Sequence, residues 1–308
     1  MKRCLAFVLG GGGARGAMQV GALRALLEAG YKPDLLVGTS IGAANAAALA
    51  LYGVNLEGVD ALERAWGVAA DSYLMDPRLA RVWLRTLMSW VNKGADRQVT
   101  EFLGAAGIVA DLTFEQITGV RLALIGADLT TGQPVIYGQD PRQSVLRGVL
   151  ASTAIPPWFP PVEHDGRVVI DGGALSNLAI EPALTMGASE IIALDLNDPE
   201  NKLGSDSGVN QWTGQLLYSL SKRHAQLELE LAEARGVPVH HIELRSQPAI
   251  PIWDFTSYRP LVDIGYEIAQ RSILQWEEAR KPRMFIPVRV REFLSRNAPI
   301  LIPPSQTA

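Results

Sequence analysis

The apolar run Leu5–Leu9 leads directly into four consecutive glycines, Gly10–Gly13, and this junction constrains the fold more than any other stretch. A short apolar run that ends in glycine predicts a buried strand followed by a tight turn. The next segment, Ala17–Ala29, predicts a helix that ends at Gly30. Strand, glycine turn and helix in this order indicate an α/β fold with one loop whose backbone is open to close approach.

Strand-like and helix-like segments alternate along the rest of the chain. The stretch Asp128–Pro134 predicts a hairpin turn, so part of the sheet should be antiparallel. Near-continuous apolar strands between helices predict a mainly parallel sheet covered on both faces. The expected strands are Leu35–Val37, Arg121–Ala127, Pro134–Tyr137, Val168–Ile170, Ile191–Leu196 and Val239–Leu244, and the expected helices are Ile41–Tyr52, Pro141–Ala151, Glu181–Met186, Gly214–Ala234 and Leu261–Ala279.

Length, charge and cysteine content limit the class of protein. The 308 residues suffice for one large α/β domain, and a net charge of −4 gives no bulk attraction to nucleic acid. The single cysteine, Cys4, cannot form an intramolecular disulfide, which fits a reducing compartment. No run reaches the roughly 20 apolar residues that a membrane span needs. We therefore expect a cytoplasmic protein that is soluble or touches membranes peripherally, with no nucleic-acid partner.

The segment Gly38-Thr39-Ser40-Ile41-Gly42 fits the pattern G-x-S-x-G between an apolar strand and a helix of small residues. A serine on such a sharp turn projects its hydroxyl, and the flanking glycines relieve crowding. The first N–H groups of the helix, that of Ile41 above all, favour negative charge at the same place. This context favours Ser40 as a nucleophile, and the alternative is that Ser40 only caps the helix.

The stretch Gly11–Gly16 also fits G-x-G-x-x-G, the pattern of dinucleotide-binding loops. In those folds an acidic residue closes the second strand, whereas here Asp34 precedes the strand Leu35–Val37. The pattern of a P-loop fails because no lysine follows the loop. The bare N–H groups suit an oxyanion hole equally well, and a structural turn is a further alternative. Arg15 could support the loop or pair with an anionic head group.

A serine nucleophile needs a base, and Asp171 is the stronger candidate for it. Asp171 ends an apolar strand and precedes Gly172 and Gly173, at the kind of strand end where α/β sheets assemble sites. Its pKa, near ~3.9 in water, would have to be raised by partial desolvation. The alternative is that Asp171 caps a turn. The four histidines, His164, His224, His240 and His241, have no telling local motif.

Metal ligation is not expected, because the sequence has no H-E-x-x-H, no cysteine cluster and no pair of histidines at helical spacing.

Three motifs, Gly11–Gly16, Gly38–Gly42 and Asp171–Gly173, stand in order with the block "ASTAIPPWFPPV" (Ala151–Val162) between the last two. Together they resemble the patatin-like phospholipase family, and the stretch Asp254–Ala269 also resembles part of that family. The resemblance implies a three-layer α/β/α sandwich with a mainly parallel central sheet, distantly similar to the α/β hydrolases. It also implies a lipid acyl hydrolase of the phospholipase A type, which takes lipid or other acyl esters as substrate and needs no cofactor.

Carried over to this chain, the resemblance makes Ser40 the nucleophile and Asp171 the base of a Ser-Asp dyad. The N–H groups of Gly11, Gly12, Gly13 and Ile41 form the oxyanion hole. Arg15 and Gly16 support the oxyanion loop. The remaining motif residues are Gly38, Gly42, Gly172 and Gly173.

Two other classes of function stay open at this point. The first is a nucleotide-dependent oxidoreductase that uses the N-terminal glycine loop. The second is a catalytically silent binding or regulatory protein of the same fold.

The expected domain organisation is a catalytic domain over residues 1–280 and a C-terminal extension over 281–308. Within the first, Arg78–Gly94 carries tryptophans, leucines and four basic residues at helical spacing. Such a helix can lie on an anionic membrane or can pack on the core.

Overall fold

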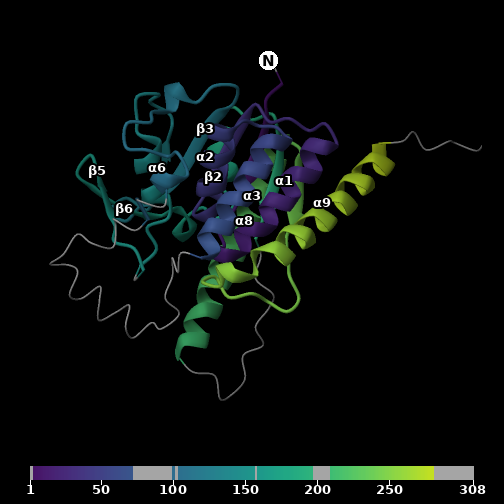
Figure 1. Ribbon diagram of the computed structural model, residues 1–308. Helices are drawn as coiled ribbons and strands as arrows, with labels where there is room; N and C mark the ends of the chain where they lie inside the picture. Colours follow the sequence, from purple (N-terminus) through teal and green to yellow (C-terminus); the bar gives the residue numbers. More distant parts are fainter. Residues whose placement is uncertain (1–2, 72–98, 101–102, 157, 197–208, 281–308) are drawn as a thin grey trace, which may run out of the picture. The chain divides into compact units, whose positions relative to one another are not determined.

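The computed structural model describes residues 3–71, 99–100, 103–156, 158–196 and 209–280 (Figure 1). The chain divides into two compact units, Met1–Ile273 and Leu274–Ala308. The C-terminal extension that we expected from residue 281 lies outside the described residues, so its boundary stays a prediction. The same holds for the amphipathic segment Arg78–Gly94.

An eight-stranded mixed sheet forms the centre of the first unit, with the strand order β5-β6-β3-β2-β1-β7-β8 and with β4 paired to β3. The pairings of β1, β2, β3, β7 and β8 along this order are parallel, whereas β4, β5 and β6 pair antiparallel at the β3 end. The strands are β1 (Leu5–Leu9), β2 (Leu35–Thr39), β3 (Arg121–Asp128), β4 (Gln133–Tyr137), β5 (Val162–His164), β6 (Arg167–Asp171), β7 (Glu190–Asp195) and β8 (Val239–Glu243).

Helices cover both faces of the sheet, which gives the expected three layers. The helices that the argument uses are α1 (Ala17–Glu28), α2 (Ile41–Tyr52), α3 (Leu56–Ala70), α6 (Val145–Ser152), α7 (Ile180–Thr185), α8 (Val209–Ala234) and α9 (Tyr258–Arg280). On one face, α2 lies against β1, β2 and β3, and α1 and α3 pack on α2. On the other face, α7 and α8 bury a cluster that includes Ala6, Val8, Leu35, Val37, Ala225 and Ala232.

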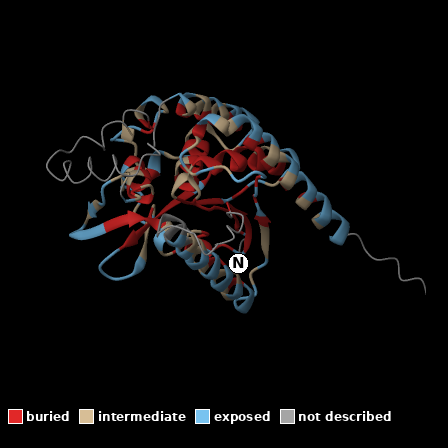
Figure 2. Cartoon of the chain, turned by 90° about the horizontal axis from the view of Figure 1, so that it is seen from below, coloured by how far each residue is buried: buried red, intermediate tan, exposed pale blue. Residues whose placement is uncertain are grey.

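Burial follows this layering. Figure 2 shows the buried residues gathered on the strands and on the helix faces that cover them. The central strands β1, β2 and β7 are buried along their whole length. Continuous burial of this kind is what a parallel strand covered on both faces requires, and it explains the unbroken apolar runs in the sequence.

Most of the expected elements are confirmed, and the differences have local causes. The strand Leu5–Leu9, the helix Ile41–Tyr52 and the hairpin at Asp128–Pro134 are present as predicted. Helix α6 begins at Val145 instead of Pro141, because the Ser144 side chain caps it at the Arg147 N–H.

Two other elements differ more. Helix α8 begins at Val209, earlier than the predicted Gly214. Helix α3 was not predicted, although the cap Asn55 and the buried residues Val59, Leu62 and Trp66 mark it at helical spacing. Among the described residues, no helix is long and apolar enough to cross a membrane.

The first turn of α2 lies in direct contact with the backbone of β1. A Cβ atom placed on Gly42 would lie 2.1 Å from the Leu9 carbonyl oxygen and 2.7 Å from that of Gly10. Real Cβ atoms do not approach backbone oxygens so closely, so only glycine permits this packing. The contact sets the position of the helix N-terminus relative to the end of β1.

We therefore predict that Gly42→Ala lowers the free energy of unfolding by about 1–3 kcal/mol, because the methyl group forces α2 away from β1. Chemical denaturation measures the change. Gly104→Ala serves as the control, since a Cβ atom there meets no atom of the described residues within 4 Å. Equal stability of the two variants would contradict the close packing of α2 on β1.

Candidate active site

Strand β3 brings Ser40 and Asp171 together. Thr39, the last residue of β2, pairs with Ile125, and Asp171, the last residue of β6, pairs with Gly126. β2 runs parallel to β3 and β6 runs antiparallel to it, and their registers make the two strands end opposite neighbouring residues of β3. The two predicted site residues are thus adjacent in space although they are far apart in the sequence.

Ser40 occupies a strained turn between β2 and α2. Its φ of 55° and ψ of −126° lie outside the regions that non-glycine residues ordinarily adopt. Such a conformation costs roughly 1–3 kcal/mol and persists only where the surroundings enforce it. The Ser40 side chain makes no capping hydrogen bond to α2, so the alternative that it serves as a helix cap is wrong.

A buried hydroxyl that the sequence analysis did not single out holds the Ser40 backbone. The Ser40 N–H donates to the Oγ of Ser152 (2.9 Å), and Ser152 Oγ donates to the Ile125 carbonyl oxygen. Ser152 ends α6 and is fully buried. Its only signal in the sequence was its place in the block Ala151–Val162, because its partners are backbone groups of distant segments.

The Asp171 carboxyl is buried next to Ser40, with only 4% of the residue exposed. Oδ1 accepts a hydrogen bond from the Gly173 N–H (2.7 Å), whereas Oδ2 has no partner of ordinary geometry among the described residues. Burial raises the pKa of Asp171 to about 6, and the nearby Ser40 hydroxyl and the Gly173 N–H oppose that rise. The Ser40 hydroxyl thus lies near enough to lower the pKa of Asp171, although no hydrogen bond of ordinary geometry joins the two side chains.

The glycine-rich loop after β1 presents backbone N–H groups beside Ser40. The N–H groups of Gly10 and Gly11 donate to the carbonyl oxygens of Leu194 and Asn177. Within the described part of the chain, the N–H groups of Gly12, Gly13 and Ile41 donate no hydrogen bond to any acceptor. Of the four predicted oxyanion donors, Gly11 is thus occupied by Asn177, and the other three are available.

Arg15 stabilises this loop from within the protein. The residue is 7% exposed, and its Nε donates to the Gly12 carbonyl oxygen (3.1 Å). The Gly12 C=O and the Gly13 N–H belong to one trans peptide group and point in opposite directions. The bond from Arg15 to the Gly12 carbonyl oxygen therefore turns the Gly13 N–H away from the guanidinium. Gly13 has a φ of 58°, and a Cβ there would lie 2.4 Å from the Ile252 carbonyl oxygen, so the turn requires glycine.

The other predicted motif glycines lie in or beside the turns around this pair. Gly38 lies on β2 and Gly42 in the first turn of α2, Gly16 ends the turn before α1, and Gly172 and Gly173 form the turn after β6.

Asn177 links the glycine-rich loop to the turn after Asp171, and the sequence analysis did not identify it. Its Nδ2 donates to the Gly11 carbonyl oxygen (3.3 Å), and its own carbonyl oxygen accepts the Gly11 N–H. A Cβ on Gly173 would lie 2.9 Å from Asn177 Oδ1, so the amide also touches that turn. The close spacing of Asp171, Gly173 and Asn177 was the one signal available.

The histidines lie in other environments. His240 and His241 on β8 contact Glu190 and Asp195 on β7, and β1 and β7 separate β8 from β2. His164 packs against the ring of Tyr137. His224 lies on α8, which contacts α7 and β8. In the described ranges, no group of three or more His, Cys, Asp or Glu side chains is placed to hold a metal ion.

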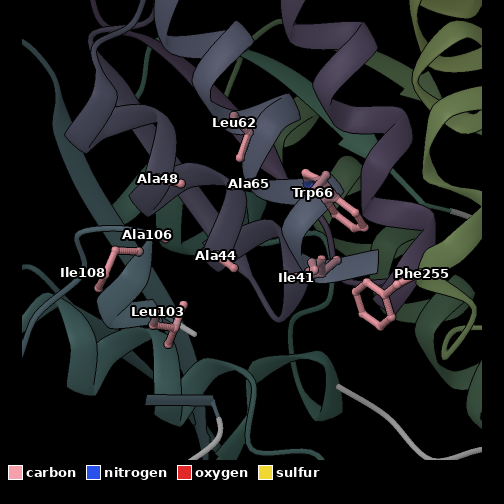
Figure 3. Close-up of a pocket in the computed structure, with 11 residues that line it drawn as sticks. Ile41, Ala44, Ala48, Leu62, Ala65, Trp66, Leu103, Ala106, Ile108 and Phe255 are labelled. Atoms are coloured by element: carbon pink, nitrogen blue, oxygen red, sulfur yellow. The ribbon is translucent and has the colours of Figure 1, made fainter. Parts of the chain in front are cut away.

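An apolar pocket opens beside the start of α2 (Figure 3). Trp66 and Phe255 stack at its edge with ring centroids 5.6 Å apart, and the indole N–H of Trp66 donates to Asn45. The wall is almost entirely hydrocarbon. It is lined by Ile41, Ala44 and Ala48 of α2, by Leu62, Ala65, Trp66 and Ala69 of α3, and by Leu103, Ala106, Ile108 and Phe255.

Comparison with known proteins gives consistent matches. A family model described as patatin-like phospholipase matches residues 7–184. An uncharacterised NTE family protein of Mycobacterium bovis is 29% identical over 221 residues, which are 70% of this chain and 56% of that protein. Patatin-like phospholipase domain-containing protein 7 of Mus musculus is 32% identical over 202 residues, 62% of this chain and 13% of that protein. The chain thus spans about half the length, or less, of these relatives.

Solved structures are more distant. VipD from Legionella pneumophila aligns with a TM-score of 0.45 and 16% identity over 89% of this chain and 67% of its own. Human GIVD cytosolic phospholipase A2 aligns with a TM-score of 0.45 and 12% identity over 89% of this chain and 59% of its own.

The buried carboxyl of Asp171 predicts a pH-dependent change in stability. A folded pKa of about 6, raised from 3.8, means that stability present at low pH is lost as the pH rises through the folded value. We expect the stability of Asp171→Asn relative to wild type to increase by about 2 kcal/mol between pH 4 and pH 6.5. Denaturant unfolding at both pH values measures this difference.

Asp140→Asn is the matched control, because the exposed Asp140 carboxyl has its pKa lowered by hydrogen bonds from Arg142. Its relative stability should change little between pH 4 and pH 6.5, because a lowered pKa places the Asp140 titration below that range. A constant difference between Asp171→Asn and wild type would show that ionised Asp171 is not destabilised in the folded protein.

Proposed function

Because the chain belongs to the patatin-like phospholipase family, we propose that it hydrolyses acyl esters of lipids with Ser40 as nucleophile and Asp171 as general base. The observation that carries this proposal is the meeting of a strained serine turn and a buried carboxyl on neighbouring residues of β3. A serine held in a costly conformation beside a buried acid is hard to explain by stability alone.

The reaction proceeds in two halves. Asp171 accepts the proton of the Ser40 hydroxyl as Oγ attacks the ester carbonyl carbon, and the oxyanion accepts hydrogen bonds from Gly12, Gly13 and Ile41. Collapse of this intermediate breaks the bond to the alcohol, which leaves with the proton from Asp171. Water then gives a proton to Asp171 and attacks the acyl-enzyme, and Ser40 regains its proton as the carboxylic acid departs.

The electrostatics of the site suit this chemistry. The Ile41 N–H is the first of α2, where the helix dipole adds to the attraction for a developing negative charge. Asp171 with a pKa of about 6 is ionised at neutral pH, and it is a stronger base than an exposed aspartate. An imidazole is not required, which agrees with the other contacts of the histidines.

The apolar pocket suits a fatty-acyl chain. Ile41 lies both at the proposed oxyanion hole and in the pocket wall, so a chain attached to Ser40 can enter the pocket directly. Alanines of α2 and α3 leave the space, and burying each methylene there contributes about 0.8 kcal/mol. Lipid esters with a hydrocarbon acyl group are therefore the proposed substrates, in accord with the phospholipase A type of activity.

The other two classes of function have less support. Family membership counts against a nucleotide-dependent oxidoreductase, and Gly11 donates to Asn177, so it is not available to a phosphate. A catalytically silent protein would have no reason to keep both the strained Ser40 and the buried Asp171. The proposed contact with a membrane rests on Arg78–Gly94, outside the described residues.

Ser40→Ala should abolish hydrolysis of p-nitrophenyl esters, because the nucleophile is lost, and it should prevent covalent labelling by a fluorophosphonate. Peptide mass spectrometry of the labelled wild type should locate the adduct on Ser40. Asp171→Asn should also remove turnover, whereas replacement of His240 or His241 should not. Ser219→Ala on the exposed surface of α8 is the control. Wild-type turnover by Ser40→Ala, or labelling elsewhere, would refute the mechanism.

Filling the pocket at Ala48 should select against long acyl chains. Ala48 lies two helical turns beyond Ser40, so Ala48→Leu should lower kcat/KM for a p-nitrophenyl decanoate about 10-fold and spare the butyrate, as expected if about two methylenes lose their contacts. Ala44→Leu, one turn closer to Ser40, is the matched variant and should impair both esters. Equal effects of Ala48→Leu on both chain lengths would place the acyl group outside this pocket.

A further inference from the structure

A half-buried carboxylate outside the proposed catalytic set reaches the site from the far face of the sheet. Glu228 lies on α8, and both of its oxygens are engaged with the segment that follows Asp171. Oε1 accepts a hydrogen bond from the Ser176 hydroxyl (2.6 Å), and Oε2 accepts one from the Glu181 N–H (2.9 Å). The carboxylate therefore holds two points of the chain between Asp171 and α7.

Ser176 in turn contacts the chain on both sides of the proposed dyad. Its N–H donates to the carbonyl oxygen of Gly172 (2.9 Å), the residue after Asp171. Its carbonyl oxygen accepts from the Oγ1 of Thr39 (3.1 Å), the residue before Ser40. Thr39 is fully buried and Ser176 is nearly so. A shift of Ser176 would consequently move the backbone next to Asp171 and the backbone next to Ser40 relative to each other.

We propose that Glu228 is a positioning residue for the reaction proposed above, whose ionised carboxylate fixes Ser176 and the start of α7 and so keeps Asp171 aligned with Ser40. This proposal rests on the proposed function. Glu228 touches neither member of the dyad and acts through Ser176.

The chemistry of the contacts calls for a carboxylate and not merely for a polar side chain. Both partners of Glu228 are donors here, and only an ionised carboxylate offers two acceptor oxygens without a proton of its own. In Glu228→Gln the amide NH2 would face either the Glu181 N–H or the Ser176 hydroxyl. The first pairing sets donor against donor, and the second forces the hydroxyl to turn. Protonation of Glu228 has a similar effect.

Glu228 should titrate in the neutral range. Burial raises its pKa to about 7, the negative charge of Glu181 on α7 adds to the rise, and bonds from Ser176 and the backbone N–H groups of Glu181 and Ile180 oppose it. His224 lies one turn before Glu228 on α8. On β8, the other element that α8 contacts, His240 and His241 pair with Glu190 and Asp195.

Two groups are therefore expected to govern the loss of activity at acid pH. Glu228 must be ionised to hold Ser176, so kcat should begin to fall as the pH drops through about 7. Asp171 must be ionised to accept the serine proton, so a second fall should follow through about 6. The first fall in kcat reflects lost alignment of Asp171 with Ser40, and the second reflects a protonated Asp171 that can no longer accept the serine proton.

The test compares pH profiles of kcat and KM on p-nitrophenyl butyrate for the full-length chain and its variants. Glu228→Gln should lower kcat about 10- to 100-fold at pH 8 with little change in KM, because a misaligned dyad slows chemistry and not binding. Its remaining acid limb should show one group, near the pKa of Asp171. Glu228→Asp should recover part of the rate. Glu230→Gln, exposed on the same helix, is the control and should match wild type.

Ser176→Ala gives an independent measurement if Glu228→Gln does not fold. It removes the link to the site but leaves the contact between Glu228 and the Glu181 N–H, and it should lower kcat with KM unchanged. Wild-type kcat in either variant, or a Glu228→Gln profile that still shows the group near pH 7, would overturn the proposal. Turnover that survives Ser40→Ala in the same assay would overturn the proposed function as well, so the two failures are distinguishable.

Discussion

One edge of β3 holds the site together through backbone hydrogen bonds. The parallel partner β2 ends opposite Ile125, and the antiparallel partner β6 ends opposite Gly126. The positions of Ser40 and Asp171 are not set by a hydrogen bond between their own side chains. The distance between them follows from the registers of β2 and β6 against β3. These registers are hard to change, because a slip of one residue would turn every buried side chain of the strand to the opposite face.

The contacts around this edge reinforce the same geometry. Ser152 joins the Ser40 N–H to the Ile125 carbonyl, Asn177 joins the glycine-rich loop to the turn after Asp171, and Ser176 joins that turn to Thr39. Ser152 and Asn177 act through side chains bonded to backbone groups, whereas Ser176 acts through its backbone, since its N–H donates to Gly172 and its carbonyl oxygen accepts from the Thr39 hydroxyl. Leaving a buried polar atom without a partner costs free energy. Each bond therefore also opposes a displacement of the segments that it joins.

Sequence reasoning succeeded where the determinant was local. The strand Leu5–Leu9, the helix Ile41–Tyr52 and the hairpin after β3 follow from apolar runs, small residues and turn residues that lie next to one another. Ser40 and Asp171 were predicted as site residues because each stands in a recognisable turn, and the structure places the two side by side. Ser152, Asn177 and Glu228 were not found, since their partners lie far away in the chain and their own surroundings carry no pattern. The occupied N–H of Gly11 escaped prediction for the same reason.

The antiparallel β6 also affects the order in which the two residues of the proposed site come together. The segment through α2 contains the strained serine turn but no carboxyl, and Asp171 arrives only after most of the central sheet has been synthesised. Contacts of such long sequence separation form late, since the entropy of loop closure must be overcome first. In the growing or partly folded chain, the proposed nucleophile Ser40 therefore lacks its proposed base, Asp171, until β6 pairs with β3.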